Sequence, residues 1–268
     1  MRMDQPQSEM HIPTEMTASD TAALDRLAEL LFERRSGVAF TGAGISTESG
    51  IPDYRGPNGL WKKTPPPDFR EFLSNPDHRI THWRRRQERY KNLATKEPNA
   101  GHFALAKLQQ YGFIQEIVTQ NIDGLHQKAG SDPASIIELH GSAHHVRCLV
   151  CGRLFDAEPF DRAFNGEEPS CPVCGGMVKE STISFGQSLV ADDLRTALTL
   201  ARSAGVILVV GSSLTVNPAA KIPREAARAG ATLAIINNQP TPLDNLAALL
   251  VEAPAGAALT YLVERLNL

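Results

Sequence analysis

Short apolar runs separated by stretches of helical spacing constrain the fold of this 268-residue chain more than any other feature. The runs show no polar alternation, which is typical of strands buried on both faces of a parallel sheet. They lie at residues 38–40, 113–119, 136–139, 206–210, 232–236 and 248–251. Helical patterns separate most of them, for example at residues 20–35, 101–110, 191–204 and 218–229. This alternation predicts an α/β fold with a parallel sheet and helices on both faces.

Three stretches fall outside this alternation. Residues 1–18 are rich in Gln, Pro, Thr and Glu, and we expect them to form a disordered tail. Residues 56–98 are first rich in proline and then basic, and they contain no obvious strand of the sheet. Residues 141–181 carry all four cysteines, and we expect them to form an inserted module.

The composition and charge exclude several classes of protein. Lys and Arg number 27 against 30 Asp and Glu, so no overall positive field would attract nucleic acid or an anionic membrane. The longest apolar stretch, at residues 204–210, is far shorter than the roughly 20 residues that a membrane helix needs. The N-terminal residues contain no apolar signal core. We therefore expect a cytoplasmic protein with no membrane partner and no nucleic-acid partner.

Two cysteine pairs give the strongest local signal. Cys148 and Cys151 form one C-x2-C pair, Cys171 and Cys174 form the other, and 19 residues separate the pairs. This spacing is typical of a tetrahedral zinc site, since each close pair presents two thiolates to one ion. Two disulfides or free buried thiols are the alternatives, and a cytosolic compartment disfavours the disulfides. Four thiolates close the coordination sphere, so we expect one structural Zn²⁺ per chain.

A glycine-rich loop follows the first predicted strand, with Gly42, Ala43 and Gly44 at its start. Such glycines either let the backbone approach a phosphate closely or form an ordinary turn. Thr47 stands where the third glycine of a dinucleotide fingerprint belongs, and no second strand ends in an acidic residue about 20 positions further on. The loop can hold a dinucleotide, but the sequence does not indicate hydride transfer.

Polar residues follow the other predicted strands. Asn121 and Asp123 come after the strand at 113–119, where they either contact a ligand or cap the next helix. His140 ends the strand at 136–139 and is either structural or a general base. Small or amide residues end two later strands; these are Gly211, Ser212, Ser213 and Asn237. Because the carboxyl ends of parallel strands meet at one edge of a sheet, this convergence predicts a nucleotide site.

A basic run lies within residues 83–91. Its cations are Arg84, Arg85, Arg86, Arg89 and Lys91, interleaved with two aromatic residues. The expected interpretation is a solvated helix face, and the alternative is a contact with nucleic acid.

The motifs resemble those of the sirtuins, the NAD-dependent protein-lysine deacylases. The matching segments, besides the two cysteine pairs, are GAGISTESGIPDYRGPNGLW (42–61), EPNAGH (97–102), TQNIDGLH (119–126), ELHG (138–141), SFGQSL (184–189), GSSLTVNP (211–218) and IIN (235–237). The resemblance implies a Rossmann-like NAD-binding domain and a small zinc-ribbon and helical domain, with NAD and the acylated lysine in the cleft between them. We expect the large domain to comprise residues 19–55, 99–140 and 187–268. We expect the small domain to comprise residues 56–98 and 141–186.

The resemblance also assigns roles to individual residues. His140 is expected to be the general base, with Asn121 and Asp123 holding the nicotinamide carboxamide and the nearby ribose. The expected NAD contacts, from the loop, the strand ends and the motifs together, are Gly42, Ala43, Gly44, Asp53, Tyr54, Arg55, Gln120, Asn121, Asp123, Gly211, Ser212, Ser213 and Asn237. The expected contacts with the acyl group and the substrate peptide are Tyr54, Ile183, Phe185, Gly186, Val216, Asn217 and Arg84.

The activity implied is NAD-dependent removal of acetyl or other acyl groups from lysines of partner proteins. The products are nicotinamide, free lysine and O-acyl-ADP-ribose. Protein mono-ADP-ribosyl transfer is an alternative that uses the same activated ribose. A non-catalytic nucleotide-sensing or DNA-binding module is a second alternative, although such a module needs no general base.

The chain departs from the family pattern around the expected acyl site. Tyr54 replaces the usual Phe, and residues 179–182, Lys-Glu-Ser-Thr, differ from the more usual Arg-Pro-Asp/Asn-Val. In desuccinylating members, a Tyr and an Arg three residues apart bind the acyl carboxylate. Thr81 and Arg84 take these positions here. We therefore expect weak desuccinylation, with Arg84 still able to contact a carboxylate.

Overall fold

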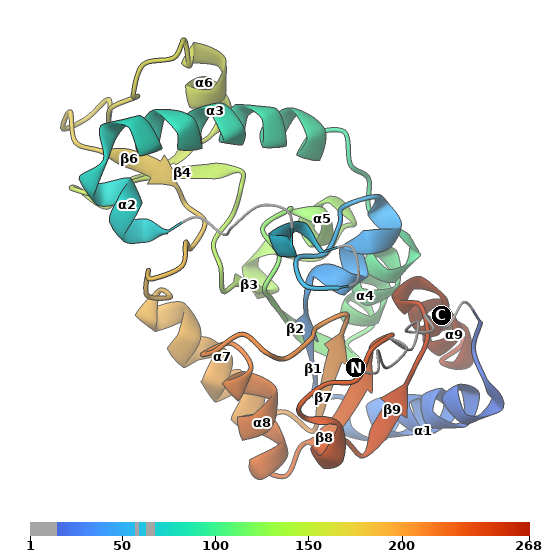
Figure 1. Ribbon diagram of the computed structural model, residues 1–268. Coiled ribbons are helices and arrows are strands. Elements are labelled where there is room, and N and C mark those ends of the chain that lie inside the picture. The colour runs from blue at the N-terminus through green and yellow to red at the C-terminus, as the bar shows by residue number, and fades with distance from the viewer. Residues whose placement is uncertain (1–14, 57–58, 63–67) are drawn as a thin grey trace, which may run out of the picture.

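The predicted parallel sheet is present in the computed structural model, which describes residues 15–56, 59–62 and 68–268. Within those residues the sheet has six strands in the order β3-β2-β1-β7-β8-β9, all paired in parallel (Figure 1). They are β1 (Gly37–Thr41), β2 (Ile114–Thr119), β3 (Ile136–Glu138), β7 (Val206–Val210), β8 (Thr232–Ile236) and β9 (Leu249–Val251). Each predicted apolar run forms one strand, which confirms the predicted fold class.

Helices cover both faces of the sheet because alternate residues of a strand point to opposite sides. In β7, Leu208 packs into the cluster formed with α1, α4 and α9, whereas Ile207 and Val209 pack into the cluster formed with α7 and α8. The helices of the two layers are α1 (Ala18–Arg34), α4 (Ala100–Gln110), α9 (Ala255–Arg265), α7 (Ala191–Ser203) and α8 (Lys221–Arg228). Shorter helical segments are η1 (Ala43–Ser49), η2 (Leu60–Lys62), α5 (Leu125–Lys128), η3 (Pro133–Ser135) and η4 (Asp244–Leu246).

Several helices differ from the predicted ranges. Helix α1 begins at Ala18, inside the predicted tail, because Thr17 and Asp20 form a reciprocal capping box. The tail prediction for residues 1–14 lies outside the described residues. Helix α8 begins only at Lys221, after a turn closed by the Ala220 N–H on the Val216 carbonyl at 2.8 Å. None of the described helices is both long and apolar enough to cross a membrane.

The order of the strands sets the position of the site. The chain runs outward from β1 through β2 to β3 on one side, then returns to β7 and runs outward through β8 to β9 on the other. This reversal makes the carboxyl ends of β1 and β7 the topological switch point, where open α/β sheets bind their ligands. The glycine loop follows β1 and Gly211 follows β7, so both predicted strand ends lie at this point.

A second, antiparallel sheet holds the cysteines, at the end of the molecule where α3 and α6 lie (Figure 1). Its strands are β4 (His145–Cys148), β5 (Leu154–Asp156) and β6 (Val178–Glu180), in the order β5-β4-β6. The helices of this region are α2 (Phe69–Ser74), α3 (Pro76–Leu93) and α6 (Glu158–Ala163). Trp83 of α3 is fully buried among Val146, Cys148 and Val178. The helical insertion therefore completes the core of the cysteine module.

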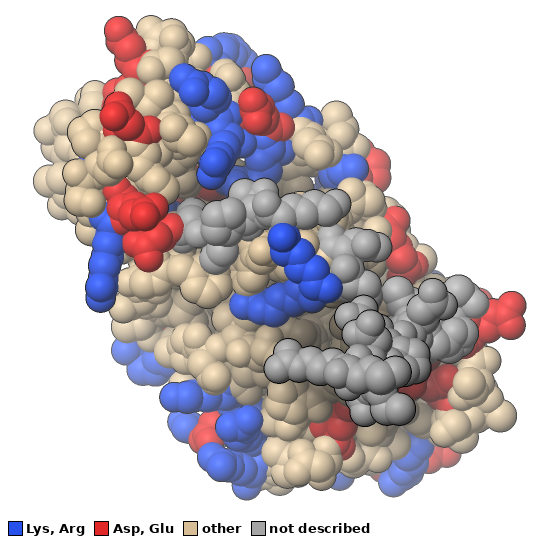
Figure 2. All heavy atoms as spheres, viewed as in Figure 1, with Lys and Arg blue, Asp and Glu red and all other residues tan. Residues whose placement is uncertain are grey.

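The prediction that the basic run is a solvated helix face is wrong for Arg86. Its side chain is 1% exposed and donates to the carboxylates of Asp161 at 2.8 Å and Glu180 at 2.5 Å. Arg89 also pairs with Glu180. Other cations of the run, such as Arg84, are exposed, and Figure 2 shows basic side chains in the region of α3. Arg86 is buried because carboxylates from α6 and β6, distant in sequence, satisfy its charge.

Replacing Glu180 with Gln is expected to destabilise the fold by about 3–5 kcal/mol, since it removes one buried charge from an ion-pair cluster. Burial opposes ionisation of Glu180, but Arg89 and Arg86 outweigh burial and lower its pKa to about 2. The stabilisation is therefore complete above the ordinary pKa of 4.5 and is lost as the pH falls towards 2. Denaturant unfolding of wild type and Glu180→Gln measures this effect. The difference between their free energies of unfolding should be large at pH 7 and smaller at pH 3.

The matched control for this experiment is Arg84→Met. Arg84 is an exposed residue of the same helix, so its replacement should change stability by less than about 0.5 kcal/mol. Two results would contradict the role assigned to the Glu180 carboxylate. One is an equal loss of stability in Arg84→Met and Glu180→Gln. The other is a difference in free energy of unfolding between wild type and Glu180→Gln that does not depend on pH.

Candidate active site

The four cysteines form one cluster beside β4 and β6. Cys148 Sγ lies 3.5 Å from Cys174 Sγ, Cys151 Sγ lies 3.8 Å from Cys171 Sγ, and all four sulfur atoms lie within 4.8 Å of one another. All four are free of disulfide bonds. A tetrahedron with zinc–sulfur bonds of about 2.3 Å places its sulfur atoms about 3.8 Å apart. The cluster therefore fits one zinc ion.

The backbone prepares this cluster for a metal. The N–H groups of Cys151 and Val150 donate to Cys148 Sγ, each at 3.4 Å. These bonds lower the pKa of the Cys148 thiol to about 6, which favours the thiolate form that binds zinc. Because four sulfur ligands leave no open coordination position, the zinc that this site takes is structural.

The glycines at the switch point pack against each other. The Gly44 N–H donates to the Gly211 carbonyl at 2.8 Å, and a Cβ on Gly44 would lie only 2.6 Å from Gly211 Cα. Gly211 also has a φ of +60°, where side chains are strained. These two glycines thus bring the loops after β1 and β7 into contact. The loop then enters η1 instead of a regular helix, in agreement with its departure from the dinucleotide fingerprint.

Asn121 and Asp123 are both buried at the end of β2, next to the glycine loop. The Asn121 amide donates to the Gly42 carbonyl at 3.2 Å and to Ser46 Oγ at 3.1 Å. Ser46 Oγ in turn donates to Asp123 Oδ2 at 2.7 Å. The other oxygen of Asp123 accepts the Leu125 N–H at 3.0 Å, although the N-cap of α5 is Gly124 and not Asp123 as one interpretation predicted. The Asp123 carboxylate therefore contacts both the start of α5 and the polar group at the end of β2.

His140 is half-buried at the end of β3, and its Nδ1 lies 3.0 Å from the Gln120 carbonyl oxygen. Since a carbonyl only accepts hydrogen bonds, Nδ1 carries the hydrogen and Nε2 keeps its lone pair. Burial lowers the pKa of His140 from its ordinary value of 6.5, and the nearby Arg55 lowers it further against the opposing effect of the Gln120 bond. The ring is therefore neutral at pH 7, with Nε2 available as a base.

Of the other strand ends, that of β7 is hydrogen-bonded to these groups, whereas Ser213 and Asn237 bond to residues nearby in the sequence. Gln120 Nε2 donates to Ser212 Oγ at 2.8 Å and so connects the end of β2 to the end of β7. Ser213 Oγ lies 3.0 Å from Thr215 Oγ1. The Asn237 amide donates to the Gln239 carbonyl at 2.6 Å, after β8. The predicted convergence of polar side chains at one edge of the sheet is present.

A cluster of aromatic rings joins the loop after η1 to the predicted substrate segment. The ring of Trp61 lies 4.9 Å from both Tyr54 and Phe185, measured between centroids, and the Arg55 guanidinium lies 4.1 Å from the Trp61 centroid. Asp53 Oδ1 accepts the Gly56 N–H at 2.8 Å and shapes the same loop. Tyr54 and Phe185, which the sequence assigned to one acyl site, are thus brought together through Trp61.

The predicted substrate residues do not all meet. The Ile183 N–H donates to the His140 carbonyl at 2.8 Å, which places the segment 183–186 beside the candidate base. Val216 and Asn217 precede α8, and within the described residues no hydrogen bond joins them to that segment. Arg84 is exposed on α3, and within the part of the chain that the structure describes no hydrogen bond or ion pair joins it to the site. Burial raises the pKa of Tyr54, and Arg89, whose side chain is 44% exposed, is the cation that opposes this rise.

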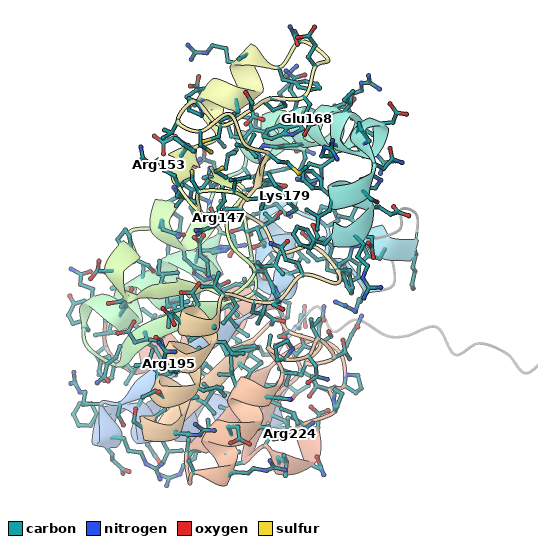
Figure 3. All side chains as sticks on the ribbon, turned by 90° about the vertical axis from the view of Figure 1, so that its left-hand side faces the viewer. Arg147, Arg153, Glu168, Lys179, Arg195 and Arg224 are labelled. Atoms are coloured by element: carbon teal, nitrogen blue, oxygen red, sulfur yellow. The ribbon has the colours of Figure 1, made fainter. Side chains whose placement is uncertain are left out.

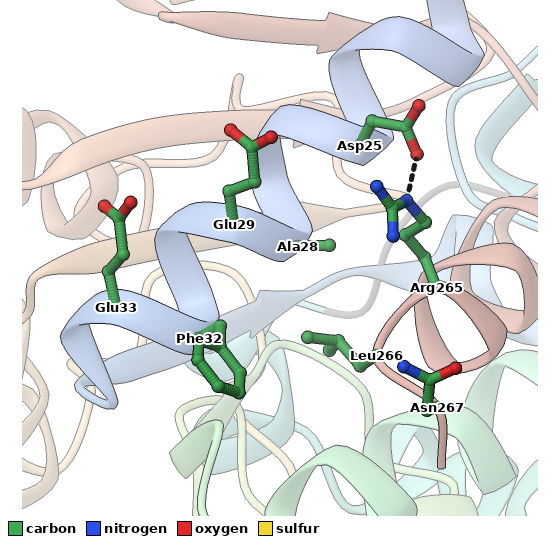
Figure 4. A pocket seen from close by; sticks show the side chains of 8 residues that line it. All are labelled: Asp25, Ala28, Glu29, Phe32, Glu33, Arg265, Leu266 and Asn267. Carbon is green, nitrogen blue, oxygen red and sulfur yellow. Dashed lines mark hydrogen bonds and ion pairs between the residues drawn. The ribbon is translucent and has the colours of Figure 1, made fainter.

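Two cavities lie away from these groups. One, of about 260 Å³, lies between α1 and the C-terminal residues, where Arg265 Nε donates to Asp25 at 2.8 Å (Figure 4). The other, of about 910 Å³, lies in the small sheet region and includes Phe155 and Phe160 in its lining. Neither contains a predicted site residue, so the candidate site is the edge of the main sheet.

Several buried polar residues around Asp123 were not predicted from the sequence. His102 Nε2 lies 3.5 Å from Ser46 Oγ, and His126 Nε2 lies 2.9 Å from Thr41 Oγ1. Burial lowers the pKa of His102 to about 4 and that of His126 to about 3, so both rings are neutral at pH 7. Their positions within the EPNAGH and TQNIDGLH motifs were the available signal.

The fold and the site define a nucleotide-binding α/β protein that carries a structural zinc module. The model of the Sir2 family matches residues 42–218, and the chain belongs to that family. It is 41% identical over 246 residues to NAD-dependent protein deacetylase 1 of Bradyrhizobium diazoefficiens, which is 91% of this chain and 97% of that protein. The relationship to the sirtuins predicted from the motifs is confirmed.

Solved structures give the same result. A complex of Sir2 with a p53 peptide and NAD⁺ has a TM-score of 0.78 and 36% identity, with 89% of this chain and 96% of that chain covered. A mutant Sir2 homologue in complex with ADP ribose has a TM-score of 0.84 and 33% identity, with 90% and 96% covered. The chain therefore shares its fold with proteins solved with NAD⁺, ADP ribose and a peptide.

Proposed function

We propose that this protein uses NAD to remove acetyl groups, and related acyl groups, from lysine side chains of partner proteins, releasing nicotinamide, free lysine and O-acyl-ADP-ribose. The observation that carries the proposal is His140, a neutral histidine whose Nδ1 is bound to the Gln120 carbonyl and whose Nε2 has no hydrogen-bond partner among the described residues. The same residue is hydrogen-bonded through its carbonyl to the segment 183–186. A base, a nucleotide site and a peptide segment therefore meet at one edge of the sheet.

NAD supplies a ribose whose bond to nicotinamide can be exchanged for a bond to the acyl oxygen. Asn121 and Asp123 are proposed to hold the nicotinamide carboxamide and the ribose, with Ser46 fixing the Asp123 carboxylate. The remaining NAD contacts are proposed for the residues at the strand ends and in the loop, which are Gly42, Ala43, Gly44, Asp53, Tyr54, Arg55, Gln120, Gly211, Ser212, Ser213 and Asn237. His140 Nε2 is proposed to accept the proton of a ribose hydroxyl. A positioned general base of this kind typically accelerates a reaction by about 10²–10⁴-fold.

The peptide is proposed to bind as an added strand between residues 184–187 and residues 216–218, a mode that reads main chain more than side chains. The acyl chain is proposed to contact Tyr54, Ile183, Phe185 and Val216. The proposal of weak desuccinylation stands on the missing Tyr at position 81 and is supported by the exposed position of Arg84.

The test is mass spectrometry of acetyl-, succinyl- and long-chain acyl-lysine peptides incubated with the protein, with and without NAD. We expect NAD-dependent loss of the acetyl group and an equal amount of O-acetyl-ADP-ribose, with slower loss of succinyl. ADP-ribose attached to protein would favour the transferase instead. Intact NAD and intact peptides would favour a non-catalytic module.

Two further expectations belong to this proposal. The division into a large domain of residues 19–55, 99–140 and 187–268 and a small domain of residues 56–98 and 141–186 is supported by the two separate sheets and the buried cluster around Trp83. The location in the cytoplasm stays a prediction from the sequence, and cell fractionation would test it.

A further inference from the structure

Lys179, at the centre of β6, is a buried cation that the proposed reaction does not use. Its side chain is 1% exposed, and Figure 3 labels it within the body of the small sheet region. The ammonium donates to the Thr182 carbonyl at 2.5 Å and to the Glu180 carbonyl at 3.3 Å, and it lies 5.9 Å from the centroid of the Phe72 ring. Lysine is almost never fully buried unless it is paired, so this position calls for a specific role.

The two carbonyls belong to a turn that leads directly into the peptide segment. The Ile183 N–H, the next after Thr182, donates to the His140 carbonyl. The Ser181 N–H donates to the His145 carbonyl at 2.9 Å. A Cβ on Gly141 would overlap the Ser181 carbonyl oxygen, so this turn is in close contact with the residue after His140. Lys179 binds the same turn through its carbonyl groups.

The far end of the peptide segment is connected to Lys179 through α2. The Phe69 N–H, at the start of α2, donates to the Phe185 carbonyl at 2.9 Å. Phe72, on the same helix, presents its ring to the Lys179 ammonium. One cation therefore contacts the turn before the segment and the helix that binds its other end.

We propose that Lys179 is a positioning residue, whose ammonium fixes the turn 180–182 and the helix α2 and thereby sets the place of the peptide segment 183–186 relative to His140. The inference rests on the proposed function of that segment. Lys179 itself has no part in holding NAD, so its loss should raise KM for the peptide and leave KM for NAD within about twofold.

A dependence on alkaline pH follows from the surroundings of Lys179. The pKa of Lys179 is lowered to about 8, mainly by burial. The Glu180 carboxylate raises this pKa, whereas Arg89 and Arg86 of α3 lower it further. His82 of α3 is close to the same carboxylate, but burial lowers its own pKa to about 3, so it carries no charge at pH 7. The part of α2 against Lys179 presents the Phe72 ring. Above pH 8 the ammonium loses its proton, so KM for the peptide should rise there.

The experiment compares Lys179→Met with Lys179→Arg in steady-state assays on an acetyl-lysine peptide, with KM for NAD measured in parallel. Met keeps the length of the side chain without a charge, and Arg keeps the charge at every pH and is the more usual family residue. We expect Lys179→Met to raise peptide KM by about tenfold at pH 7, as for the loss of charge-assisted hydrogen bonds. Lys179→Arg should restore peptide KM and abolish its rise above pH 8. Lys91→Met, at an exposed lysine of α3, is the matched control.

Phe185→Ala separates this inference from the proposed function. If Phe185→Ala raises peptide KM and Lys179→Met does not, the role of Lys179 is overturned while the peptide segment keeps its role. If Phe185→Ala leaves peptide KM unchanged, both are overturned. Lys179→Met could instead raise KM for the peptide and KM for NAD equally and also lower the melting temperature. That result would show that Lys179 has only a structural role. Should Lys179→Met not fold, the pH dependence of peptide KM in wild type and Lys179→Arg decides: equal rises above pH 8 overturn the inference.

Discussion

Replacing His140 with alanine is expected to lower kcat by about 10²–10⁴-fold, the usual contribution of a positioned general base. NAD affinity should change by less than about threefold, because the proposed NAD contacts lie on other residues. The fold should persist, since the ring is half-buried and makes one hydrogen bond, to the Gln120 carbonyl. Steady-state kinetics, NAD titration and circular dichroism measure these three quantities.

The pH profile sharpens this prediction. The pKa of His140 lies below 6.5, so the wild-type ring accepts a proton at neutral pH and ceases to do so as the pH falls through that pKa. The wild-type kcat should therefore decline on the acid side, and the residual activity of His140→Ala should lack that decline. His78→Ala, at a histidine of α3 that faces Glu71 outside the site, is the matched control. Loss of helical signal in His140→Ala would instead identify a structural histidine.

Removal of zinc is expected to unfold the small sheet and to abolish turnover. In small zinc modules the apparent free energy of zinc binding is about 10–16 kcal/mol. The packing of a three-stranded sheet cannot supply a stabilisation of this size on its own. The loss of activity should follow because β6, which carries Lys179, leads directly into the peptide segment. Chelation and Cys151→Ser should give the same result, read as zinc content, circular dichroism and deacetylation rate.

Replacing Cys151 separates the effect of losing zinc from the effect of disturbing the hydrophobic core. Cys151 is exposed, so serine removes a ligand and leaves the core around Trp83 unchanged. Val150→Ser is the matched control, because Val150 is 71% exposed in the same turn and offers no ligand atom. An unchanged unfolding curve after complete chelation would contradict the structural role of zinc.

The strands could be predicted because their burial is indicated by the apolar residues of each strand itself. The runs at 206–210 and 232–236 match β7 and β8 residue for residue, since short continuous apolar runs between helical patterns are typical of strands buried on both faces of a sheet. The cysteine spacing likewise limits the metal geometry to one kind of site. Helix α9 was not singled out, and its buried face becomes evident only from its packing against α1 and α4.

The buried charges could not be predicted, because their energy depends on partners far away along the chain. Arg86 and Glu180 are 94 residues apart, and only the meeting of α3 with β6 makes burial of either side chain tolerable. From the sequence alone a run of arginines is most simply solvated. Lys179 gave no signal beyond its departure from the family pattern.

The sequence by itself determined the parallel sheet, the zinc ligands and the family, because each depends on local spacing or on motifs, and the same motifs singled out His140, Asn121 and Asp123 as candidate site residues. The tertiary structure alone decided which nitrogen of His140 is hydrogen-bonded, since the Gln120 carbonyl that binds it lies on a neighbouring strand end. It also decided that Arg84 is exposed on α3, and that Lys179 lies between α2 and the turn before the peptide segment. Hydrogen-bond partners and burial are properties of the packed chain, whereas periodicity and ligand spacing are already present in the unfolded one.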